Sequence, residues 1–449
     1  MKAIHVFLLL LLALSARAQD PFAQAAALLP QQHAQHTSGV KPLTLAELEA
    51  AALEANPEIK VVEKRLGAVQ ARIAAAGSLE DASLTYRAWG VPFREPWNFN
   101  QAQNMFMVTQ PFPGPGKRAL RSQIAGQDAD VAKAEIEAKK RDVIANVRLA
   151  FYALLRNYDE LRLHDEQVAL ARQALEAARI KYTVGRVPQQ DVLKAQIALS
   201  KLVDHVVMLR QDGELARAKL NTLVGRDPGT PIEVAGEYGV PGELPELATL
   251  QEVARQNRPE LQAVSAAIRQ SETRLKLARR AYTPDFAVSG GYMVMPSGSP
   301  FRNTYMAEFS MTLPWLNRRR HDSAIASATS ESSAVSAEYD ARRAAVFHEI
   351  RETLIRTDAA RRLVELYRDT LRPQAQTTLK ATTAAYQTDR TDFLNLLDSQ
   401  NLSLDVEYAY YRALSEYEQR LADLERAIGA PLPRPPNRAK DSASNEVRP

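Results

Sequence analysis

The sequence predicts a mainly α-helical protein with a small β part, built as a tandem duplication. Three observations support this prediction: a helix-favouring composition, an internal repeat, and short runs that alternate like β-strands. Apolar residues make up 45% of the chain and charged residues 24%, with only 18 glycines among 449 residues. This composition, dominated by Ala, Leu, Gln, Glu, Lys and Arg, favours long helices over disorder.

The N-terminus has the pattern of a secretory signal peptide over residues 1–18. Lys2 precedes an apolar run of about a dozen residues, and the small-x-small sequence "ARA" suits cleavage after Ala18. The alternative interpretation is an apolar N-terminal helix that stays in the protein. We therefore expect an exported chain that begins with an N-terminal tail at residues 19–42.

Membrane attachment by a helix or a lipid is not expected. No later stretch approaches the ~20 apolar residues that a membrane-spanning helix needs. The chain has no cysteine, which excludes disulfides, thiolate metal sites and a lipid on an N-terminal cysteine. Any attachment of this unlipidated chain to a membrane would therefore depend on strands.

One motif occurs twice in the chain. "YTVGRVPQQDVLKAQ" begins at Tyr182 and "YQTDRTDFLNLLDSQ" begins at Tyr386, so the offset is 386 − 182 = 204 residues. "TLVGRDP" and "RAIGAPL" are related at the same offset. Two related pairs of segments at one offset indicate a tandem duplication of the chain. The predicted units are repeats at 43–225 and 247–429, a linker at 226–246 and a disordered tail at 430–449.

Each copy has the same predicted order of elements: a helix, two strands, a very long helix, a tight tip and a returning helix. "NPE" and "RPE" mark a helix start in each copy, because proline suits the first helical turn. In the first copy the elements lie near 45–77, 82–112, 117–184, 185–190 and 190–224. In the second copy they lie near 247–281, 285–314, 320–388, 389–394 and 392–428.

The long helix of the first copy carries an apolar residue at every seventh position, and so does its returning helix. This strict period is typical of coiled-coil packing rather than of an ordinary globular helix. A helix over 117–184 would be about 100 Å long at ~1.5 Å per residue. The two ladders are Val147, Leu154, Leu161, Val168, Leu175 and Tyr182, and Ala195, Leu202, Leu209, Ala216 and Leu223.

The strand runs alternate with period two. In "TYMAEFSMTLP", Tyr305, Phe309 and Met311 fall on one face of a strand, and Glu308 and Ser310 fall on the other. "DFAVSGGYMVM" alternates similarly, and "SLTYRAW" does so weakly. Segments of about ten residues with one apolar face fit the strands of an outer-membrane barrel. A half-buried hairpin in a soluble sheet would alternate in the same way.

No catalytic signature occurs in the chain. It lacks a phosphate-binding glycine loop, GxSxG and HExxH, so we predict neither an enzyme nor a cofactor. The formal net charge of +4 is small, and basic and acidic residues are intermixed along the chain. This pattern does not indicate a nucleic-acid-binding surface. His33 and His36 could touch a metal, but no third ligand accompanies them, so no metal site is predicted. The helical histidines are expected on solvated faces: His164, His205, His321 and His348.

Polar residues concentrate at the two predicted tips. Gly185 and Arg186 form the first tip turn, and Asp389 and Arg390 occupy it in the second copy, where Asp392 suits a helix start. Two interpretations stay open: these residues are helix caps and soluble charge, or they make contacts that close a passage. The candidates for closure are Asp191, Asp392 and Asp398, just past the tips, and Arg186, Arg390 and Tyr386 beside them.

The duplicated plan, the signal peptide and the tip pattern Y-x-x-G/D-R resemble the TolC-type outer membrane efflux proteins over residues 43–429. "QPFPGPGKR", from Gln110, resembles the branch that works with heavy-metal RND pumps. The resemblance implies a homotrimer with four strands per protomer, a 12-stranded β-barrel in outer membrane lipid and a trimeric α-helical tunnel in the periplasm. It also implies a passive channel that receives substrate from an inner-membrane pump, of RND type, through a periplasmic adaptor protein.

The resemblance further implies that tip contacts hold the tunnel mouth shut. By motif position these residues are Tyr386, Asp191 and Asp398, with an arginine position at Arg390 or Thr391. Asn395 stands where the family can place an acidic residue, so the closed network differs there. The substrate is not implied.

Two alternatives come from other classes of protein. A periplasmic adaptor also has long hairpins, but it needs β-rich modules, and this chain has strand signal for only four strands. A secreted coiled-coil structural protein would not need strand pairs at matching places in both copies.

Overall fold

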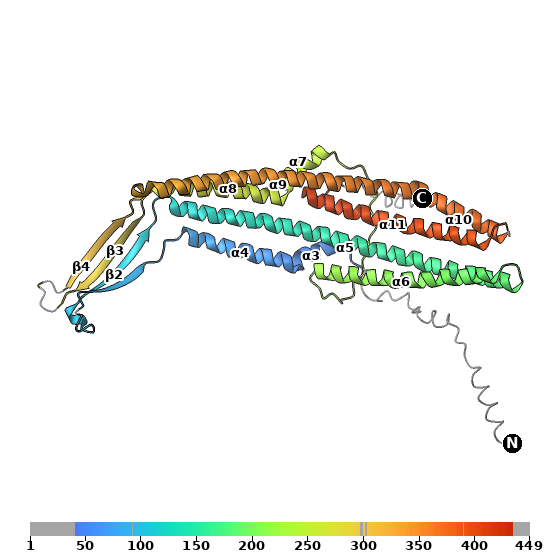
Figure 1. Ribbon diagram of the computed structural model, residues 1–449, viewed down its shortest axis with the longest axis horizontal. Coiled ribbons are helices and arrows are strands. Elements are labelled where there is room, and N and C mark those ends of the chain that lie inside the picture. Colours follow the sequence, from blue (N-terminus) through green and yellow to red (C-terminus); the bar gives the residue numbers. More distant parts are fainter. Residues whose placement is uncertain (1–40, 92, 297–299, 301–302, 389, 434–449) are drawn as a thin grey trace, which may run out of the picture.

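The computed structural model describes residues 41–433, except 92, 297–299, 301–302 and 389. The predicted signal peptide, the histidines of the N-terminal tail and Asp389 lie outside the described residues. The described chain is a long bundle of helices with a sheet at one end (Figure 1). Among the described helices, none combines the length and apolar character that a membrane-spanning helix needs.

The same order of elements occurs twice, as the sequence predicts. The first copy contains α3 (Leu45–Ala55), α4 (Pro57–Gly77), β1 (Ser83–Trp89), β2 (Gln103–Phe112), α5 (Lys117–Thr183) and α6 (Gln189–Leu223), with the short helix η1 (Phe99–Gln101) between the strands. The second contains α7 (Leu247–Asn257), α8 (Pro259–Arg279), η2 (Arg280–Tyr282), β3 (Phe286–Val294), β4 (Asn303–Met311), η3 (Pro314–Asn317), α9 (Arg318–Leu366), the π turn η4 (Tyr367–Leu371), α10 (Arg372–Gln387) and α11 (Phe393–Ile428).

The first predicted helix of each copy is two helices, so the single helices predicted near 45–77 and 247–281 are wrong. The breaks come just before Pro57 and Pro259, because proline lacks the N–H that would continue a helix. Asn56 is the N-cap of α4, and its side chain accepts hydrogen bonds from the backbone N–H groups of Glu58 and Ile59.

The long helix predicted near 320–388 is also not uniform. It contains the π turn η4, whose hydrogen-bonded rings are wider than those of an α-helix. Pro373, two residues after its end, cannot donate to a carbonyl one turn earlier, which gives a local reason for the irregularity. The corresponding part of α5 is regular over 67 residues.

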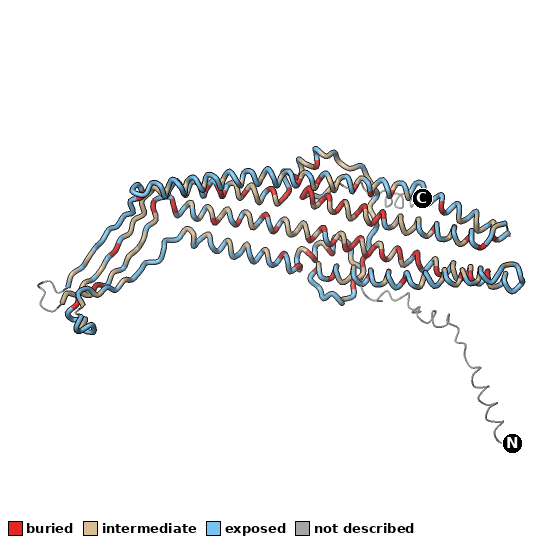
Figure 2. Tube along the Cα trace, viewed as in Figure 1, coloured by how far each residue is buried: buried red, intermediate tan, exposed pale blue. Residues whose placement is uncertain are grey.

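The four strands form one antiparallel sheet in the order β1-β2-β3-β4. The register aligns Tyr86 with Phe106, Phe106 with Tyr292, and Tyr292 with Tyr305, so four aromatic side chains share one face. This face is largely exposed, and Tyr305 is 88% exposed. Figures 1 and 2 show the sheet extending beyond the helices, with no described helix laid over it.

The opposite face of the sheet is more polar, as the alternation predicts. Thr109 and Ser289 face each other there with their hydroxyl oxygens 2.9 Å apart. Glu308, paired with Ser289 in the register, lies on the same face. A half-buried hairpin in a soluble sheet would cover its apolar face, and this sheet leaves that face open.

Each copy packs its own helices around a hydrophobic core, and both cores lie near the middle of the bundle (Figure 2). Val147 and Leu154 of the predicted ladder are fully buried, but Tyr182 is 45% exposed. His164 is also fully buried, so its predicted place on a solvated face is wrong. Its ring nitrogen Nε2 lies 2.5 Å from the carbonyl oxygen of Leu202, which satisfies a polar group inside the α5–α6 pair.

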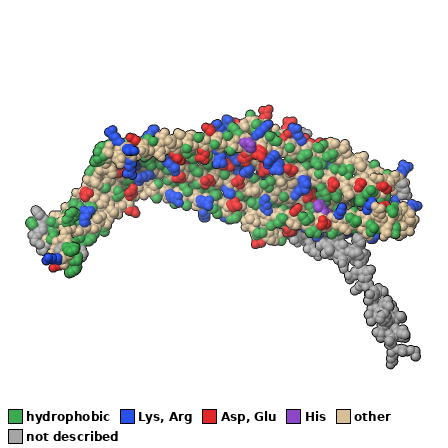
Figure 3. Space-filling view, viewed as in Figure 1, with side chains coloured by type: hydrophobic (Ala, Val, Ile, Leu, Met, Phe, Trp, Pro, Cys, Tyr) green, Lys and Arg blue, Asp and Glu red, His purple; other side chains and the backbone are tan. Residues whose placement is uncertain are grey.

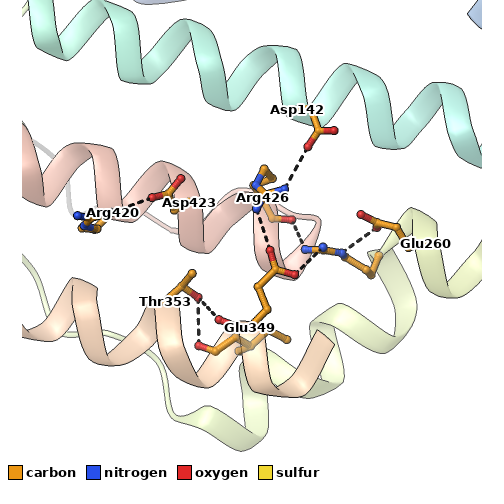
Figure 4. Close-up of polar contacts among 9 residues, drawn as sticks. Asp142, Glu260, Glu349, Thr353, Arg420, Asp423 and Arg426 are labelled. Atoms are coloured by element: carbon orange, nitrogen blue, oxygen red, sulfur yellow. Dashed lines mark hydrogen bonds and ion pairs between the residues drawn. The ribbon is translucent and has the colours of Figure 1, made fainter. Parts of the chain in front are cut away.

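A polar network joins the two copies near mid-length. Arg426 of α11 lies between Asp142 of α5, at 3.2 Å, and Glu349 of α9, at 2.8 Å (Figure 4). Arg258 is 5% exposed and contacts Glu349 at 2.8 Å and Glu260 at 2.8 Å. Breaking such a buried ionic group leaves a charge unpaired, so the network ties the hairpins together.

Candidate functional site at the helical tips

The first tip connects α5 to α6. Gly185 has a φ of 71°, the left-handed conformation that glycine adopts without steric cost. Its N–H donates to the carbonyl oxygen of Tyr182 at 3.0 Å, and the N–H of Arg186 donates to that of Lys181 at 2.9 Å. These bonds close the last turn of α5 and reverse the chain. Pro188 precedes α6 and makes no side-chain cap.

The second tip connects α10 to α11 with a different set of contacts. The N–H of Arg390 donates to the carbonyl oxygen of Ala385 at 2.8 Å, which matches the bond made by Arg186. Asp392 caps α11, because its carboxylate accepts from the N–H of Asn395 at 2.9 Å. The two tips therefore share a turn but differ at the start of the returning helix.

An apolar cluster, here called the tip cluster, packs the two hairpins against each other. Tyr386 is 7% exposed, and its ring centroid lies 6.0 Å from that of Phe393 in an edge-on arrangement. Lys181 comes from the first hairpin, and its Nζ lies 3.9 Å from the Tyr386 ring centroid. Its Nζ also donates to the Tyr386 carbonyl oxygen at 3.4 Å. The tip cluster consists of Leu175, Ala178, Ala195, Tyr386, Phe393 and Leu396.

Lys181 was not among the residues that the sequence singled out. It immediately precedes the first copy of the motif, and its partner Tyr386 lies 205 residues further along the chain. The only local signal is a cation in the last turn of a helix, which is a common and nonspecific feature.

Some of the other predicted tip residues line a groove on the second hairpin, and the rest lie outside it. Thr391, Asn395 and Asp398 line one groove of about 460 Å³ on the second hairpin, together with Ser399. Arg390 and Asp398 are exposed, and Asp191 is half-buried. Within the part of the chain that the structure describes, Asp191, Arg390 and Asp398 form no ion pair with one another.

A second cavity, of about 490 Å³, lies between the hairpins nearer mid-length, where α5, α6 and α11 meet. Glu160 lines it and is 7% exposed; burial raises the pKa of this carboxyl, although Arg156 lies 3.7 Å away. Burial lowers the pKa of the neighbouring His164. The described residues contain no group of His, Asp or Glu arranged to hold a metal ion.

The profile of the family described as "Outer membrane efflux protein" matches residues 48–226 and 250–430. The chain belongs to this family. The two matched segments correspond to the two copies seen in the order of elements, so the family assignment and the duplicated fold agree. The chain is therefore an outer membrane efflux protein, a transport channel rather than an enzyme.

Two curated relatives are similar over most of the chain. The cobalt-zinc-cadmium resistance protein CzcC of Cupriavidus metallidurans is 21% identical over 314 residues, which cover 70% of this chain and 74% of that protein. Nodulation protein T of Rhizobium leguminosarum bv. trifolii is 22% identical over 334 residues, covering 70% of this chain and 68% of that protein.

Solved outer-membrane channels have the same fold. A structure of CusC gives a TM-score of 0.73 at 14% identity, covering 86% of this chain and 92% of that one. The outer-membrane channel OprN gives a TM-score of 0.70 at 18% identity, with 86% and 90% covered. Neither alternative class drawn from the sequence, an adaptor or a secreted structural protein, is supported by these matches.

Proposed function

We propose that three copies of this chain form a passive export channel that spans the outer membrane and continues through the periplasm. Twelve strands, four from each copy, make the β-barrel, and the long helices make the tunnel. The tips close the tunnel mouth and meet a periplasmic adaptor protein, which connects the channel to an inner-membrane pump. The signal peptide is removed after Ala18, and the mature chain carries no lipid.

The observation that carries this proposal is the open apolar face of the sheet. Large apolar side chains on this face, such as Phe309 at 67% and Leu84 at 73% exposure, have no covering element among the described residues. Contiguous exposed apolar surface of this kind is typical of a membrane or protein interface. The opposite face carries Glu308 and Ser310, which suits a water-filled lumen.

The sheet edges support closure by further copies. β1 and β4 each have a neighbour on one side only, so each presents a row of unpaired backbone groups. In lipid every such group costs several kcal/mol unless a partner satisfies it. Pairing β4 of one copy with β1 of the next satisfies both edges, and three copies close a ring of twelve strands.

The pump is proposed to be of the RND type that exports heavy-metal ions. The support comes from two relatives whose names state metal resistance, CzcC and the nickel-cobalt-cadmium resistance protein NccC. Two other relatives, nodulation protein T and protein CyaE, have names that do not mention metals. We therefore propose that the pump, and not residues of this chain, selects the substrate.

Thiol labelling tests the orientation of the strands. The chain has no cysteine, so single cysteines can be placed without a background. A hydrophilic thiol reagent that enters the pore should label cysteines at Glu308 and Ser310, and should leave cysteines at Phe309 and Met311 unlabelled. Equal labelling of all four positions would contradict the barrel.

Single-channel conductance tests closure at the tips. The triple variant Asp191→Ala, Tyr386→Phe and Arg390→Ser should conduct several-fold more than the native channel, because weak contacts at the tips act together around the ring. The duplicated motif offers a matched control, Tyr182→Phe with Arg186→Ser, which should change conductance less. Unchanged conductance in intact trimers of the triple variant would reduce these residues to helix caps.

A further inference from the structure

Five arginines gather where the sheet meets the helices of the second copy. Arg279 ends α8, Arg280 begins η2, and Arg318, Arg319 and Arg320 begin α9. All five are exposed, and the short helices η2 and η3 beside them contact each other. Figure 3 shows blue side chains gathered at this bend between sheet and bundle. We call these five residues the basic collar.

The described residues do not neutralise the collar. None of its five side chains forms an ion pair with an acidic residue in the described ranges. The two closest carboxylates by sequence are already engaged. Asp285 accepts from Lys117 Nζ at 2.8 Å, and Asp322 accepts from the Tyr282 hydroxyl at 2.7 Å.

The first copy handles its own cations at the same level differently. Lys117 is buried against Asp285, Arg118 donates to the carbonyl oxygen of Gly77, and Arg121 lies 3.5 Å from Glu80. These residues begin α5, as the collar arginines begin α9. The second copy therefore presents unpaired charge, whereas the first copy pairs its cations with nearby groups of either copy.

Three of the collar arginines lie at the N-terminus of α9, where the helix dipole repels their positive charge. Arg318, Arg319 and Arg320 occupy the first turn of a 49-residue helix that has no acidic residue there and no side-chain cap. The N-terminus of a helix is partially positive, so it favours anions and disfavours cations by a few tenths of a kcal/mol or more each. An anion supplied from outside the chain would relieve this repulsion.

Apolar side chains separate the collar from the strands. Leu313 is 44% exposed, Trp315 45% and Leu316 76%. The chain thus passes from the apolar face of β4, through an exposed tryptophan, to a run of arginines. This order is typical of a membrane–water interface, where aromatic rings lie at the level of the headgroups and cations lie just beyond them.

We propose that the basic collar binds the anionic headgroups of phospholipids in the periplasmic leaflet of the outer membrane. The inference rests on the proposed function, because it requires the apolar face of the strands to lie in that membrane. Lipid is favoured over a soluble anion because Trp315 and Leu316 offer exposed apolar surface for acyl chains next to the charges. The collar would hold the bend at the depth of the headgroups.

Trp315 reports on this site directly. The chain has three tryptophans, so replacing Trp89 and Trp97 by phenylalanine leaves Trp315 alone. The full-length protein is reconstituted into bilayers that contain brominated phosphatidylglycerol or brominated phosphatidylcholine, and quenching of Trp315 fluorescence is measured. We expect phosphatidylglycerol to be preferred by about fivefold or more, with the preference falling at high salt.

The combined substitution Arg318→Gln, Arg319→Gln and Arg320→Gln should bring this preference close to one. Arg318→Lys, Arg319→Lys and Arg320→Lys should keep most of it, because the charge remains. A matched control, Arg172→Gln, Arg342→Gln and Arg351→Gln, removes three exposed arginines away from the bend and should leave the preference unchanged.

The possible outcomes separate the two proposals. Quenching of Trp315 by both lipids without preference would overturn the collar and leave the membrane placement standing. Quenching by neither lipid would overturn both. A preference that persists in the glutamine variant would assign lipid selection to other residues and overturn the collar. Inorganic phosphate that abolishes the preference more strongly than sodium chloride at equal ionic strength would indicate a soluble-anion site instead.

Discussion

Tyr182 and Tyr386 hold the same place in the two copies of one motif, yet their surroundings differ. Tyr182 is 45% exposed, whereas Tyr386 is 7% exposed and packs against Phe393 under the amine of Lys181. The duplication reproduced the turn of the backbone but not the contacts of its side chains. A hairpin in one chain has a neighbouring hairpin on one side only, so equivalent residues of the two copies meet unequal partners.

The two long hairpins also differ in packing away from the tips. The first arm is the hairpin of α5 and α6, and the second arm is the hairpin of α9, η4, α10 and α11. His164 is fully buried in the regular helix α5, whereas Arg368, 204 residues later, is exposed in the π turn η4. Arg368 pairs with Asp369 at 2.8 Å on the surface. The second arm therefore places an irregular turn where the first arm has a packed core, and variants at equivalent positions should have unequal effects.

The largest expected effect separates two glycines that follow helices of the first copy. Gly185 and Gly225 both have a φ of 71°, but a Cβ at Gly225 would lie 2.7 Å from the carbonyl oxygen of Ala55, and one at Gly185 would meet nothing within 4 Å. Gly225→Ala should cost about 2–5 kcal/mol, from left-handed backbone and overpacking together. Gly185→Ala should cost only the backbone share, about 1–2 kcal/mol.

Urea unfolding of the two variants measures this difference. Gly429, whose Cβ would lie 2.7 Å from the carbonyl oxygen of Asn257, provides the matched position in the second copy and should behave like Gly225. Equal losses at Gly185 and Gly225 would mean that the contact with the α3–α4 junction does not constrain the end of α6.

The next effect concerns the two tyrosines. Tyr386→Ala removes a buried ring and its contact with Lys181, so we expect local destabilisation of about 2–3 kcal/mol, as for other large-to-small changes in cores. Tyr182→Ala should cost well under half of that, because its ring is half exposed. Hydrogen exchange of the tip segments reports both values. Equal loss of protection would show that Tyr182 gains an unseen partner, as it would between protomers.

Much of the fold could be predicted because its signals are local. The seven-residue ladder, the alternation in "TYMAEFSMTLP" and the 204-residue offset each depend on residues close in sequence or on direct comparison. The apolar and polar faces of β4 lie as that alternation predicts. The helix breaks at Pro57 and Pro259 carried a signal too, since proline suits a first turn and not an interior.

The side-chain contacts of the site could not be predicted in the same way. His164, placed on a solvated face, is buried because α6 returns beside α5 and offers the Leu202 carbonyl. Lys181 meets Tyr386 because two hairpins pack, and no local pattern contains that pairing. The closing roles of Asp191, Arg390 and Asp398 stay predictions, because the described residues show no ion pair among these three.

A smaller effect depends on pH and should appear in the first arm only. Burial lowers the pKa of His164, which its hydrogen bond to Leu202 and the nearby Asp165 only partly offset, whereas His205 acts with burial. When the arm opens, His164 regains its ordinary pKa of about 6.5, so below that pH the opened arm binds more protons than the folded arm. The folded arm therefore loses stability as the pH falls through about 6.5. At pH 5.5 the protection of the first arm should fall by up to about tenfold.

Hydrogen exchange at pH 5.5 and 7.5, corrected for the intrinsic rate, measures this change. His164→Gln should remove the pH dependence of the first arm. The second arm, which has Arg368 at the equivalent place, serves as an internal control. A pH response of equal size in both arms, or one that survives in His164→Gln, would exclude His164 as its source.

The smallest effect concerns the starts of the two returning helices. The Asp392 carboxylate accepts from the Asn395 N–H at 2.9 Å, whereas Pro188 begins α6 without a side-chain cap. Asp392→Ala leaves that N–H without its partner and should cost about 1 kcal/mol. Pro188→Ala removes no hydrogen bond and should cost less. Asp392→Asn keeps an acceptor oxygen while removing the charge, so it should restore most of the loss. Exchange rates in the first turns of α11 and α6 report these changes. Should Asp392→Ala leave the first turn of α11 as protected as before, the second tip would be held by its packing around Phe393 rather than by its cap, and the difference between the tips would lie wholly in the tip cluster.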